Sequence, residues 1–364
     1  MILRFLRDIW QDTNNMGINK KHPLYQEDLQ NAISVSGIGR LRGKTLLITG
    51  ATGLIGVHLI DALMMLGGVK VIATGRSEEK ARARLGEYFD SPLFSFKEQD
   101  VTNPFDKSVK ADYILPLASS THPLAYSKFP IETIKANVDG AVNALELATA
   151  TESAVLYPSS VEIYGNARGD DVFCEDSTGI LNLSTARSCY TESKRLCEAL
   201  CQSYADEKGV QVRIARLSRV FGPTMLESDS KASSQFILNA LSGQDIVLKS
   251  AGEQYFSYTY VSDAVAAILH IMLNGECGQA YNVSNPECDI TLKDFAALCA
   301  EYGERKVIFD IPSETESKGF SKASRAILSN QRIVSTGFCP KYEIRDAVRR
   351  TLAILGKVIK DGLA

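Results

Sequence analysis

A tyrosine and a lysine in the segment "YTESK" are the residues whose types and spacing most clearly suggest chemistry. Tyr190 and Lys194 are four residues apart, so they share one face if the segment is helical. A nearby ammonium group favours the ionised form of a phenol, whose pKa is ordinarily about 10. The pair could therefore supply a base near neutral pH, although the same spacing also occurs on ordinary surface helices.

A second pair of candidates lies upstream in "YPSSVEIYG", where an apolar run turns polar. Ser160 would end a strand and could hydrogen-bond the same substrate hydroxyl as Tyr190, which would complete a Ser/Tyr/Lys set. Glu162 follows closely and is a candidate acid or base.

Three glycines mark a candidate dinucleotide site. Gly50, Gly53 and Gly56 have GxxGxxG spacing between a predicted strand at 44–50 and a predicted helix at 54–68. Such glycines allow a sharp turn, a close approach to a pyrophosphate and tight helix–strand packing, while the helix N-H groups meet the phosphates. A plain strand–helix connection is the alternative. The predicted contacts in this turn are Gly50, Thr52, Gly53, Leu54, Ile55 and Gly56.

The next predicted strands bear on the choice between NAD and NADP. Arg76 stands where an acidic residue would mark NAD, and an arginine there can pair with a 2'-phosphate. This favours NADP, but Glu78 or Glu79 could still reach a ribose. The third predicted strand ends at Asp100 and Val101, where an acid can meet the adenine amine.

The elements that would position these residues alternate between strand and helix. This rhythm predicts an α/β fold with a doubly wound parallel sheet of the Rossmann type. The predicted strands are 44–50, 69–75, 93–100, 111–119, 153–160 and 210–223, and the helices between them are 54–68, 77–89, 130–150 and 187–209.

Three units are predicted along the chain. Residues 1–42 read as a helical appendage, and residues 43–223 as a dinucleotide-binding domain that carries the catalytic residues. Residues 224–364 mix helices and short strands, which predicts a smaller substrate lobe with some chain crossing back.

Composition narrows the class of protein. A net charge of -3 and a pI near 5.9 leave no basic surplus for a nucleic-acid backbone. The eight cysteines form no CxxC pair, which favours reduced thiols, a cytoplasmic protein and no metal site. The opening "MILRFLRDIW" is too short and too charged to span a membrane, although a surface anchor is conceivable.

Taken together, the motifs resemble the extended short-chain dehydrogenase/reductase family, in its NAD-dependent epimerase/dehydratase branch that acts on nucleotide sugars. The resemblance covers roughly residues 44–351. It rests on "TGATGLIG", "LAS", "NVDGAVNALELA", "SSVEIYG", "YTESK", "ARLSRVFGP" and "YTYVSDAV".

The resemblance implies a tightly bound cofactor and a sugar C4 hydroxyl that Tyr190 deprotonates on the way to a 4-keto sugar. The ketone then permits loss of a C6 carboxyl group, dehydration, or re-reduction from the opposite face. Glu162 falls where dehydratases and decarboxylases have a glutamate, and the decarboxylases look most similar. Whether Glu162 handles a proton at C5 or only orients the sugar stays open.

Two departures from the family pattern affect the pocket. Val161 replaces an aspartate that many dehydratases of the dTDP-glucose type carry. Phe256 replaces an arginine that usually meets the diphosphate or a substrate carboxylate, whereas Arg219 replaces a usual asparagine. We hypothesise that the positive charge has moved across the pocket to Arg219, with a plain surface arginine as the alternative.

The resemblance also implies softer assignments. Further cofactor contacts would be Leu117, Ala118, Ser119 and Asn137. The substrate pocket would include Thr121, Arg187, Arg219, Ser234, Gln235 and Phe256. Long helices at 131–150 and 188–207 match those that form homodimers in the family. A 4-epimerase, an NADPH-dependent keto-sugar reductase and a non-catalytic dinucleotide sensor are the alternatives.

Overall fold

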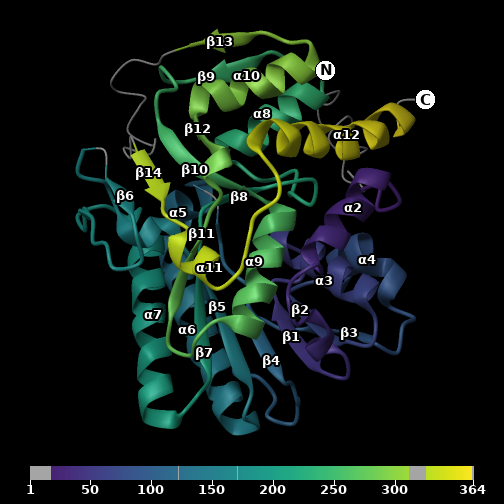
Figure 1. Ribbon diagram of the computed structural model, residues 1–364, viewed down its shortest axis with the longest axis vertical. Coiled ribbons are helices and arrows are strands. Elements are labelled where there is room, and N and C mark those ends of the chain that lie inside the picture. The colour runs from purple at the N-terminus through teal and green to yellow at the C-terminus, as the bar shows by residue number, and fades with distance from the viewer. Residues whose placement is uncertain (1–17, 122, 170, 311–324, 363–364) are drawn as a thin grey trace.

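A parallel sheet forms the centre of the computed structural model, which describes residues 18–121, 123–169, 171–310 and 325–362 (Figure 1). Within these residues seven strands pair in the order β3–β2–β1–β4–β5–β7–β11. All of their pairings are parallel, which confirms the predicted doubly wound fold. The strands are β1 (Thr45–Thr49), β2 (Lys70–Gly75), β3 (Phe94–Glu98), β4 (Tyr113–Pro116), β5 (Ala154–Ser160), β7 (Val212–Leu217) and β11 (Ala280–Val283).

Helices cover both faces of this sheet because successive strand residues point to opposite sides. Leu46 and Ile48 belong to the core on the side of α3 and α9, whereas Leu47 belongs to the core under α6 and α7. Figure 1 shows α6 and α7 side by side on one flank of the sheet. The helices of this domain are α3 (Leu54–Leu66), α4 (Glu78–Leu85), α5 (Pro123–Lys128), α6 (Pro130–Thr151), α7 (Ser188–Lys208) and α9 (Val261–Asn274), with the short η2 (Gly86–Tyr88) and η3 (Val161–Tyr164).

A smaller lobe lies beyond the carboxyl ends of the strands (Figure 1). Its strands are β6 (Val172–Phe173), β8 (Arg219–Phe221), β9 (Ile246–Leu248), β10 (Tyr255–Tyr260), β12 (Asp289–Thr291), β13 (Val307–Phe309) and β14 (Arg325–Leu328). Its helices are α8 (Ala232–Leu241), η4 (Pro286–Cys288), α10 (Leu292–Gly303), α11 (Gln331–Ser335) and α12 (Ile344–Gly362).

The boundary between the lobes differs from the single strand expected at 210–223. The segment forms two strands, because β7 stays in the main sheet while β8 pairs with β10 of the second lobe. The chain later returns, since α9 packs on the main sheet and β11 pairs with β7. The two lobes are thus linked by several crossings of the chain.

The described part of the segment set apart as an appendage, residues 18–42, is packed into the molecule. Its helix α2 (Pro23–Ala32) lies against α3 and α9, and η1 (Ile38–Leu41) follows. Tyr25 and Ala32 are fully buried, as is Asp28, which bonds Tyr260 and Arg350. The expectation of a helix at the opening segment falls outside the described residues.

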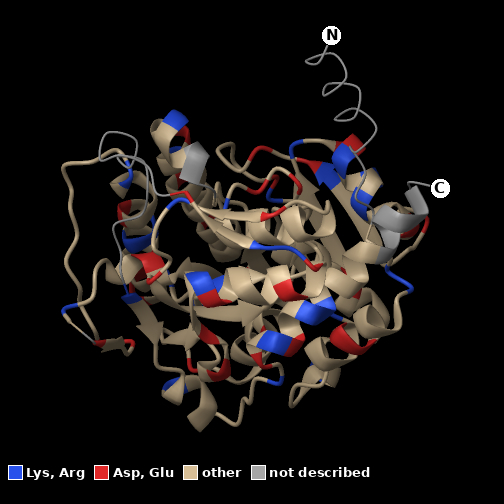
Figure 2. Cartoon of the chain, turned by 90° about the horizontal axis from the view of Figure 1, so that it is seen from above, with Lys and Arg blue, Asp and Glu red and all other residues tan. Residues whose placement is uncertain are grey.

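Charged residues of both signs are interspersed over the face drawn in Figure 2. Among the helices of the described ranges, none combines the length and the apolarity that a bilayer span requires.

Candidate active site

The glycine turn after β1 has the shape that a dinucleotide requires. Gly50 has φ +63°, and a Cβ there would lie 2.8 Å from the Ala118 backbone. A Cβ at Gly56 would lie 2.5 Å from the Gly50 carbonyl oxygen, so helix and turn touch directly. Gly53 caps α3, and no side chain of the described residues bonds the first helical N-H groups, which begin at Leu54. The turn therefore fits a pyrophosphate.

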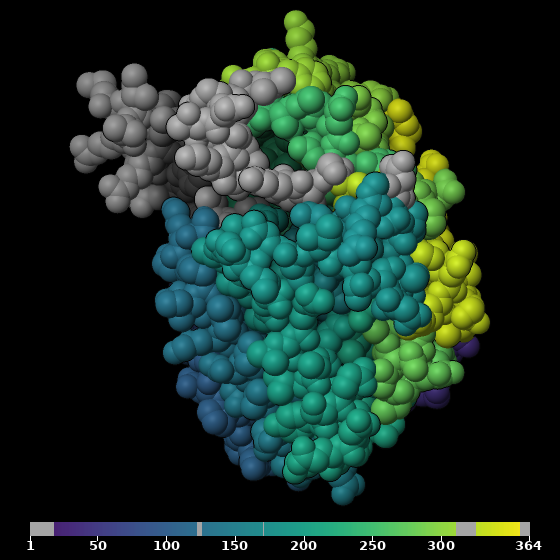
Figure 3. Space-filling view, turned by 90° about the vertical axis from the view of Figure 1, so that its left-hand side faces the viewer, coloured from purple at the N-terminus to yellow at the C-terminus, as the bar shows by residue number. Residues whose placement is uncertain are grey.

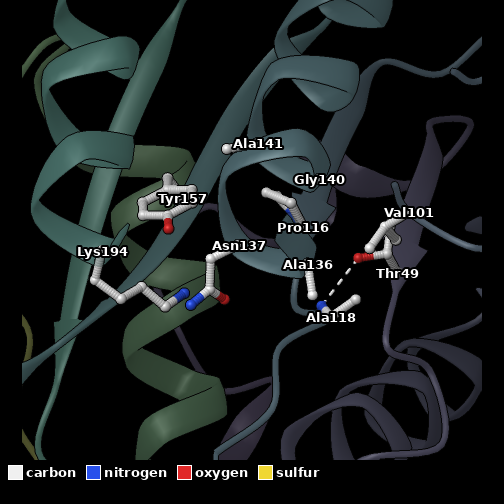
Figure 4. A pocket seen from close by; sticks show the side chains of 10 residues that line it. All are labelled: Thr49, Val101, Pro116, Ala118, Ala136, Asn137, Gly140, Ala141, Tyr157 and Lys194. Carbon is white, nitrogen blue, oxygen red and sulfur yellow. Dashed lines mark hydrogen bonds between the residues drawn. The ribbon is translucent and has the colours of Figure 1, made fainter. Parts of the chain in front are cut away.

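This turn lies at the point where the strand order reverses, between β1 and β4. The Ala118 N-H donates to Thr49 Oγ1 at 3.0 Å, as the dashed line in Figure 4 marks. Leu117 and Thr52 are half-buried beside it. The predicted contacts Thr52, Leu117 and Ala118 are thus grouped at the switch point.

The residues predicted to meet the adenosine lie at the ends of β2 and β3. Arg76 is exposed, and its charge acts on Asp100. The Asp100 carboxylate accepts from the Thr102 N-H and hydroxyl, and these bonds lower its pKa. Val101 is buried against Gly140 of α6. One Asp100 oxygen is therefore already engaged, and the choice between NAD and NADP stays a prediction.

Asn137 ties the loop after β4 to the helix that carries Tyr190. Its side-chain oxygen accepts from Ser119 Oγ at 2.7 Å, and its amide donates to Ser193 Oγ at 2.8 Å. Ser193 in turn donates to the Tyr190 carbonyl at 2.9 Å. Asn137 thus links the loop after β4 to α7, and its role in the active site stays a prediction.

Tyr190 and Lys194 lie on one buried face of α7. Lys194 Nζ donates to the Pro158 carbonyl at 2.8 Å and lies 6.0 Å from the Tyr190 ring centre. Figure 4 shows Lys194 pointing towards Tyr157 and Asn137. Burial lowers the pKa of Lys194 to about 8.

The surroundings of the Tyr190 phenol raise its pKa. Burial is the largest cause, a hydrogen bond with Ser160 opposes it, and the charge of Glu162 adds to it. Ionisation of this phenol near neutral pH would therefore require a positive charge close to its oxygen.

Glu162 stands between two arginines. Ser160 Oγ accepts from the Glu162 N-H at 3.3 Å and caps η3, which fixes the start of this turn. The Glu162 carboxylate lies 3.8 Å from Arg187 Nη2 and 3.7 Å from Arg219 Nη2. These three charged residues come from separate segments: Glu162 from η3, Arg187 from the position before α7, and Arg219 from β8. Together they carry a net positive charge.

Arg219 also covers the residue that replaces the family arginine. Its guanidinium carbon lies 3.5 Å from the ring centre of Phe256, which is buried on β10. Arg219 Nη1 is buried and finds no hydrogen-bond partner among the described residues. The guanidinium therefore occupies the space over position 256, and the hypothesis that it meets the substrate anion there stays a prediction.

The residues predicted to meet the nucleotide are less clearly placed. Thr121 is exposed after β4. Ser234 is buried on α8, whereas Gln235 is exposed and donates to the Asp229 carbonyl at 2.6 Å. Within the part of the chain that the structure describes, no hydrogen bond or ion pair joins these three residues to Ser160 or Tyr190, so their role stays a prediction. Figure 3 shows a hollow between the green surface of the second lobe and the teal surface below it.

Two features of the site escaped the sequence reasoning. Tyr126 of α5 stacks on Tyr190 with ring centres 4.8 Å apart. The guanidinium carbon of Arg187 lies 6.0 Å from the centre of the Tyr126 ring. A single aromatic residue on a short helix carries no local signal for this contact. The second feature is a half-buried arginine on β7, Arg216.

Arg216 anchors the segments around the site. It bonds Glu198 of α7 with two nitrogens and donates to Tyr164 Oη at 2.9 Å and the Glu175 carbonyl at 2.6 Å. Tyr164 Oη donates to Asn282 of β11. Glu198 lies four residues beyond Lys194, so the sequence places it on the same face of the helix. The sequence gives no signal that Arg216 is its partner.

Comparison with known proteins agrees with this geometry. A sequence model described as the NAD dependent epimerase/dehydratase family matches residues 46–284. UDP-glucuronic acid decarboxylase 6 of Arabidopsis thaliana is 31% identical over 309 residues, which are 83% of this chain and 86% of that protein. UDP-glucuronic acid decarboxylase 1 of Danio rerio is 35% identical over 259 residues, which are 70% of this chain and 60% of that protein.

Solved structures share the fold. UDP-glucuronic acid 4-epimerase from Bacillus cereus, in complex with UDP-glucuronic acid and NAD, superposes with a TM-score of 0.75 at 18% identity, covering 86% of this chain and 99% of that one. A dTDP-glucose 4,6-dehydratase from Streptomyces venezuelae with NAD bound superposes with a TM-score of 0.74 at 21% identity, covering 86% of this chain and 97% of that one.

Proposed function

The chain belongs to the NAD-dependent epimerase/dehydratase family, and from this premise we propose that it decarboxylates a nucleotide-linked uronic acid through a 4-keto sugar. The observation that carries the proposal is the row Arg187–Glu162–Arg219 beside Ser160 and Tyr190. Two guanidinium groups around one carboxylate leave a net positive charge that a substrate carboxylate can neutralise. Curated relatives named UDP-glucuronic acid decarboxylases support this substrate class.

The first step belongs to Tyr190. A nicotinamide dinucleotide bound at the glycine turn would accept the hydride from C4 and return it later. Tyr190 Oη takes the proton of the C4 hydroxyl, and Ser160, which bonds Tyr190, orients that hydroxyl. Lys194 has a pKa of about 8, so its ammonium group is charged at neutral pH and favours the phenolate of Tyr190.

The second step takes place at C5 and C6. A ketone at C4 makes the C6 carboxylate a β-keto acid, which loses carbon dioxide without an external base. Arg187 and Arg219 would hold that carboxylate next to Glu162. Glu162 would then orient the sugar or manage the proton that C5 receives after the loss.

The cofactor would be retained through the cycle, because hydride leaves and returns on the same sugar. The exposed Arg76 favours NADP, whereas the family description favours NAD. Identifying the dinucleotide that the denatured protein releases would decide between the two cofactors.

We also propose that the protein is a homodimer formed through α6 and α7. Ile131 and Ile134 of α6 and Leu196 of α7 are large, apolar and exposed on neighbouring helices. Such a shared apolar surface is typical of an interface between identical chains.

The proposal is tested by incubating the protein, as purified, with UDP-glucuronic acid and with UDP-glucose, and following products by mass spectrometry. We expect loss of carbon dioxide from the uronic acid without added cofactor. Loss of water, unchanged mass with altered retention, or turnover only with added NADPH would instead indicate a dehydratase, an epimerase or a reductase, and each overturns the proposal.

A further inference from the structure

Arg84 of α4 joins the glycine turn to the start of the second lobe. Its Nη1 donates to the Thr52 carbonyl at 2.9 Å, and its Nη2 donates to the Thr224 carbonyl at 2.6 Å. Thr52 belongs to the glycine turn, whereas Thr224 follows β8 at the boundary between the lobes. One guanidinium therefore holds two backbone carbonyls from two parts of the chain.

A second bond runs between the same two segments. Thr224 is fully buried, and its hydroxyl donates to the Leu54 carbonyl at 2.7 Å. Leu54 begins α3, directly after the turn. The stretch from Thr52 to Leu54 is thus fastened to Thr224 at both of its ends.

Lys20, which precedes the family-matched region, bonds the backbone of Arg84. Lys20 Nζ donates to the Arg84 carbonyl at 2.8 Å and pairs with the buried Asp61 at 2.7 Å. Asp61 also accepts hydrogen bonds from Tyr25 and Tyr88. This buried cluster fixes the end of α4 against α3, so the guanidinium has a defined position.

We propose that Arg84 is a positioning residue that couples retention of the dinucleotide to binding of the nucleotide substrate. The proposal rests on the proposed function in taking the glycine turn as the cofactor site and the second lobe as part of the substrate site. Thr224 closely follows β8, which pairs with β10 of the second lobe. A nucleotide that orders the second lobe would order β8 and Thr224 and, through Arg84, the glycine turn.

The physical basis is preorganisation. Hydrogen bonds from a charged donor typically contribute about 1.5–3 kcal/mol each. Two of them on the turn and its anchor hold the N-H groups of α3 in place before the cofactor arrives, so less conformational entropy is lost on binding. Coupling between two ligands is reciprocal, so the substrate nucleotide must slow cofactor release if the cofactor favours the substrate.

The test compares native protein with Arg84→Met, both loaded with NADH, and follows the fluorescence decrease as the cofactor dissociates, with and without UDP. We expect release to be about tenfold faster in the variant, from the loss of one or two charged hydrogen bonds. We also expect that UDP slows release from the native protein and has no such effect on the variant.

Two further variants sharpen the result. Arg82→Met changes an exposed arginine on the same helix, which pairs with Glu78, and should release NADH at the native rate. Thr224→Val removes the bond to Leu54 with little change of shape, and should speed release even if Arg84→Met fails to fold. The proposal is overturned if Arg84→Met releases NADH at the native rate and UDP slows that release as in the native protein. If Arg84→Met does not fold, the same result in Thr224→Val overturns it.

This experiment is separate from the test of the reaction. NADH release and its response to UDP are measured without turnover, so a protein that does not decarboxylate can still show the coupling. Conversely, a native protein that decarboxylates but loses NADH at the same rate with and without UDP would refute the coupling alone.

Discussion

The side chain of Arg219 determines the charge of the candidate substrate pocket. It lies over the ring of Phe256 and approaches Glu162. The hypothesis that the positive charge of the pocket has moved to Arg219 is thus a prediction that a variant can test. Arg187 approaches Glu162 as well, at a similar distance.

Replacing Arg219 by glutamine should weaken binding of a uronic acid substrate selectively. The lost charged contact is of the kind that contributes about 1.5–3 kcal/mol, so KM for UDP-glucuronic acid should rise about tenfold or more. Binding of UDP alone, measured by calorimetry, should be unchanged. Arg195→Gln, at an exposed position of α7, is the matched control. An unaltered KM in Arg219→Gln would rule out this role.

Lys194 makes stability depend on pH in an unusual direction. Its pKa is lowered by burial from 10.5 to about 8, so the folded protein bears the full cost of the buried charge below about pH 8. Between these two values the unfolded chain binds more protons than the folded protein, and the stability contributed by this group rises with pH. The corresponding cost at neutral pH is about 3 kcal/mol.

Lys194→Met should consequently be inactive but more stable than the native protein near neutral pH. The lost bond to Pro158 subtracts about 1 kcal/mol at every pH. The advantage should shrink towards about pH 10, as urea unfolding at several pH values would show. Lys208→Met, at an exposed position near the end of the same helix, serves as control. A difference that is constant with pH would contradict the burial of a charged lysine.

At the scale of elements, α6 and α7 serve the site on one side and present apolar residues on the other. Asn137, Tyr190 and Lys194 face inward, whereas Ile134 and Leu196 are exposed. The hydrophobic periodicity of each helix predicts its buried side, but an exposed apolar residue within a helix has no local explanation.

Leu196→Glu should convert the proposed dimer to monomers, because it places a charge in an apolar interface. Light scattering coupled to size-exclusion chromatography measures the mass directly. Ile308→Glu, at an exposed apolar position of β13 in the second lobe, should leave the mass unchanged. If Leu196→Glu has the native mass, the α6–α7 interface is not the one used.

At the scale of the whole molecule, the described part of the N-terminal segment connects the two lobes. Asp28 of α2 bonds Tyr260 and Arg350, which belong to β10 and α12. Lys20 and Tyr25 bond Asp61 of α3, which packs on the main sheet. The segment therefore stabilises the arrangement of the lobes between which the site lies.

The main sheet and most of its helices could be predicted because strand and helix periods are local properties of the chain. The split of 210–223 into β7 and β8 could not, because β8 is a strand only through its pairing with β10. The packing of α2 was also hidden, since its partners on α3, α9 and α12 lie far away in the sequence.

The glycine turn, the shared face of Tyr190 and Lys194 and the position of Glu162 after Ser160 follow from residue spacing within single elements. The meeting of Arg187 and Arg219 at Glu162, the position of Arg219 over Phe256 and the link from Arg84 to Thr224 follow only from the folded arrangement. These contacts join segments far apart in the chain, and their geometry depends on how the two lobes pack together.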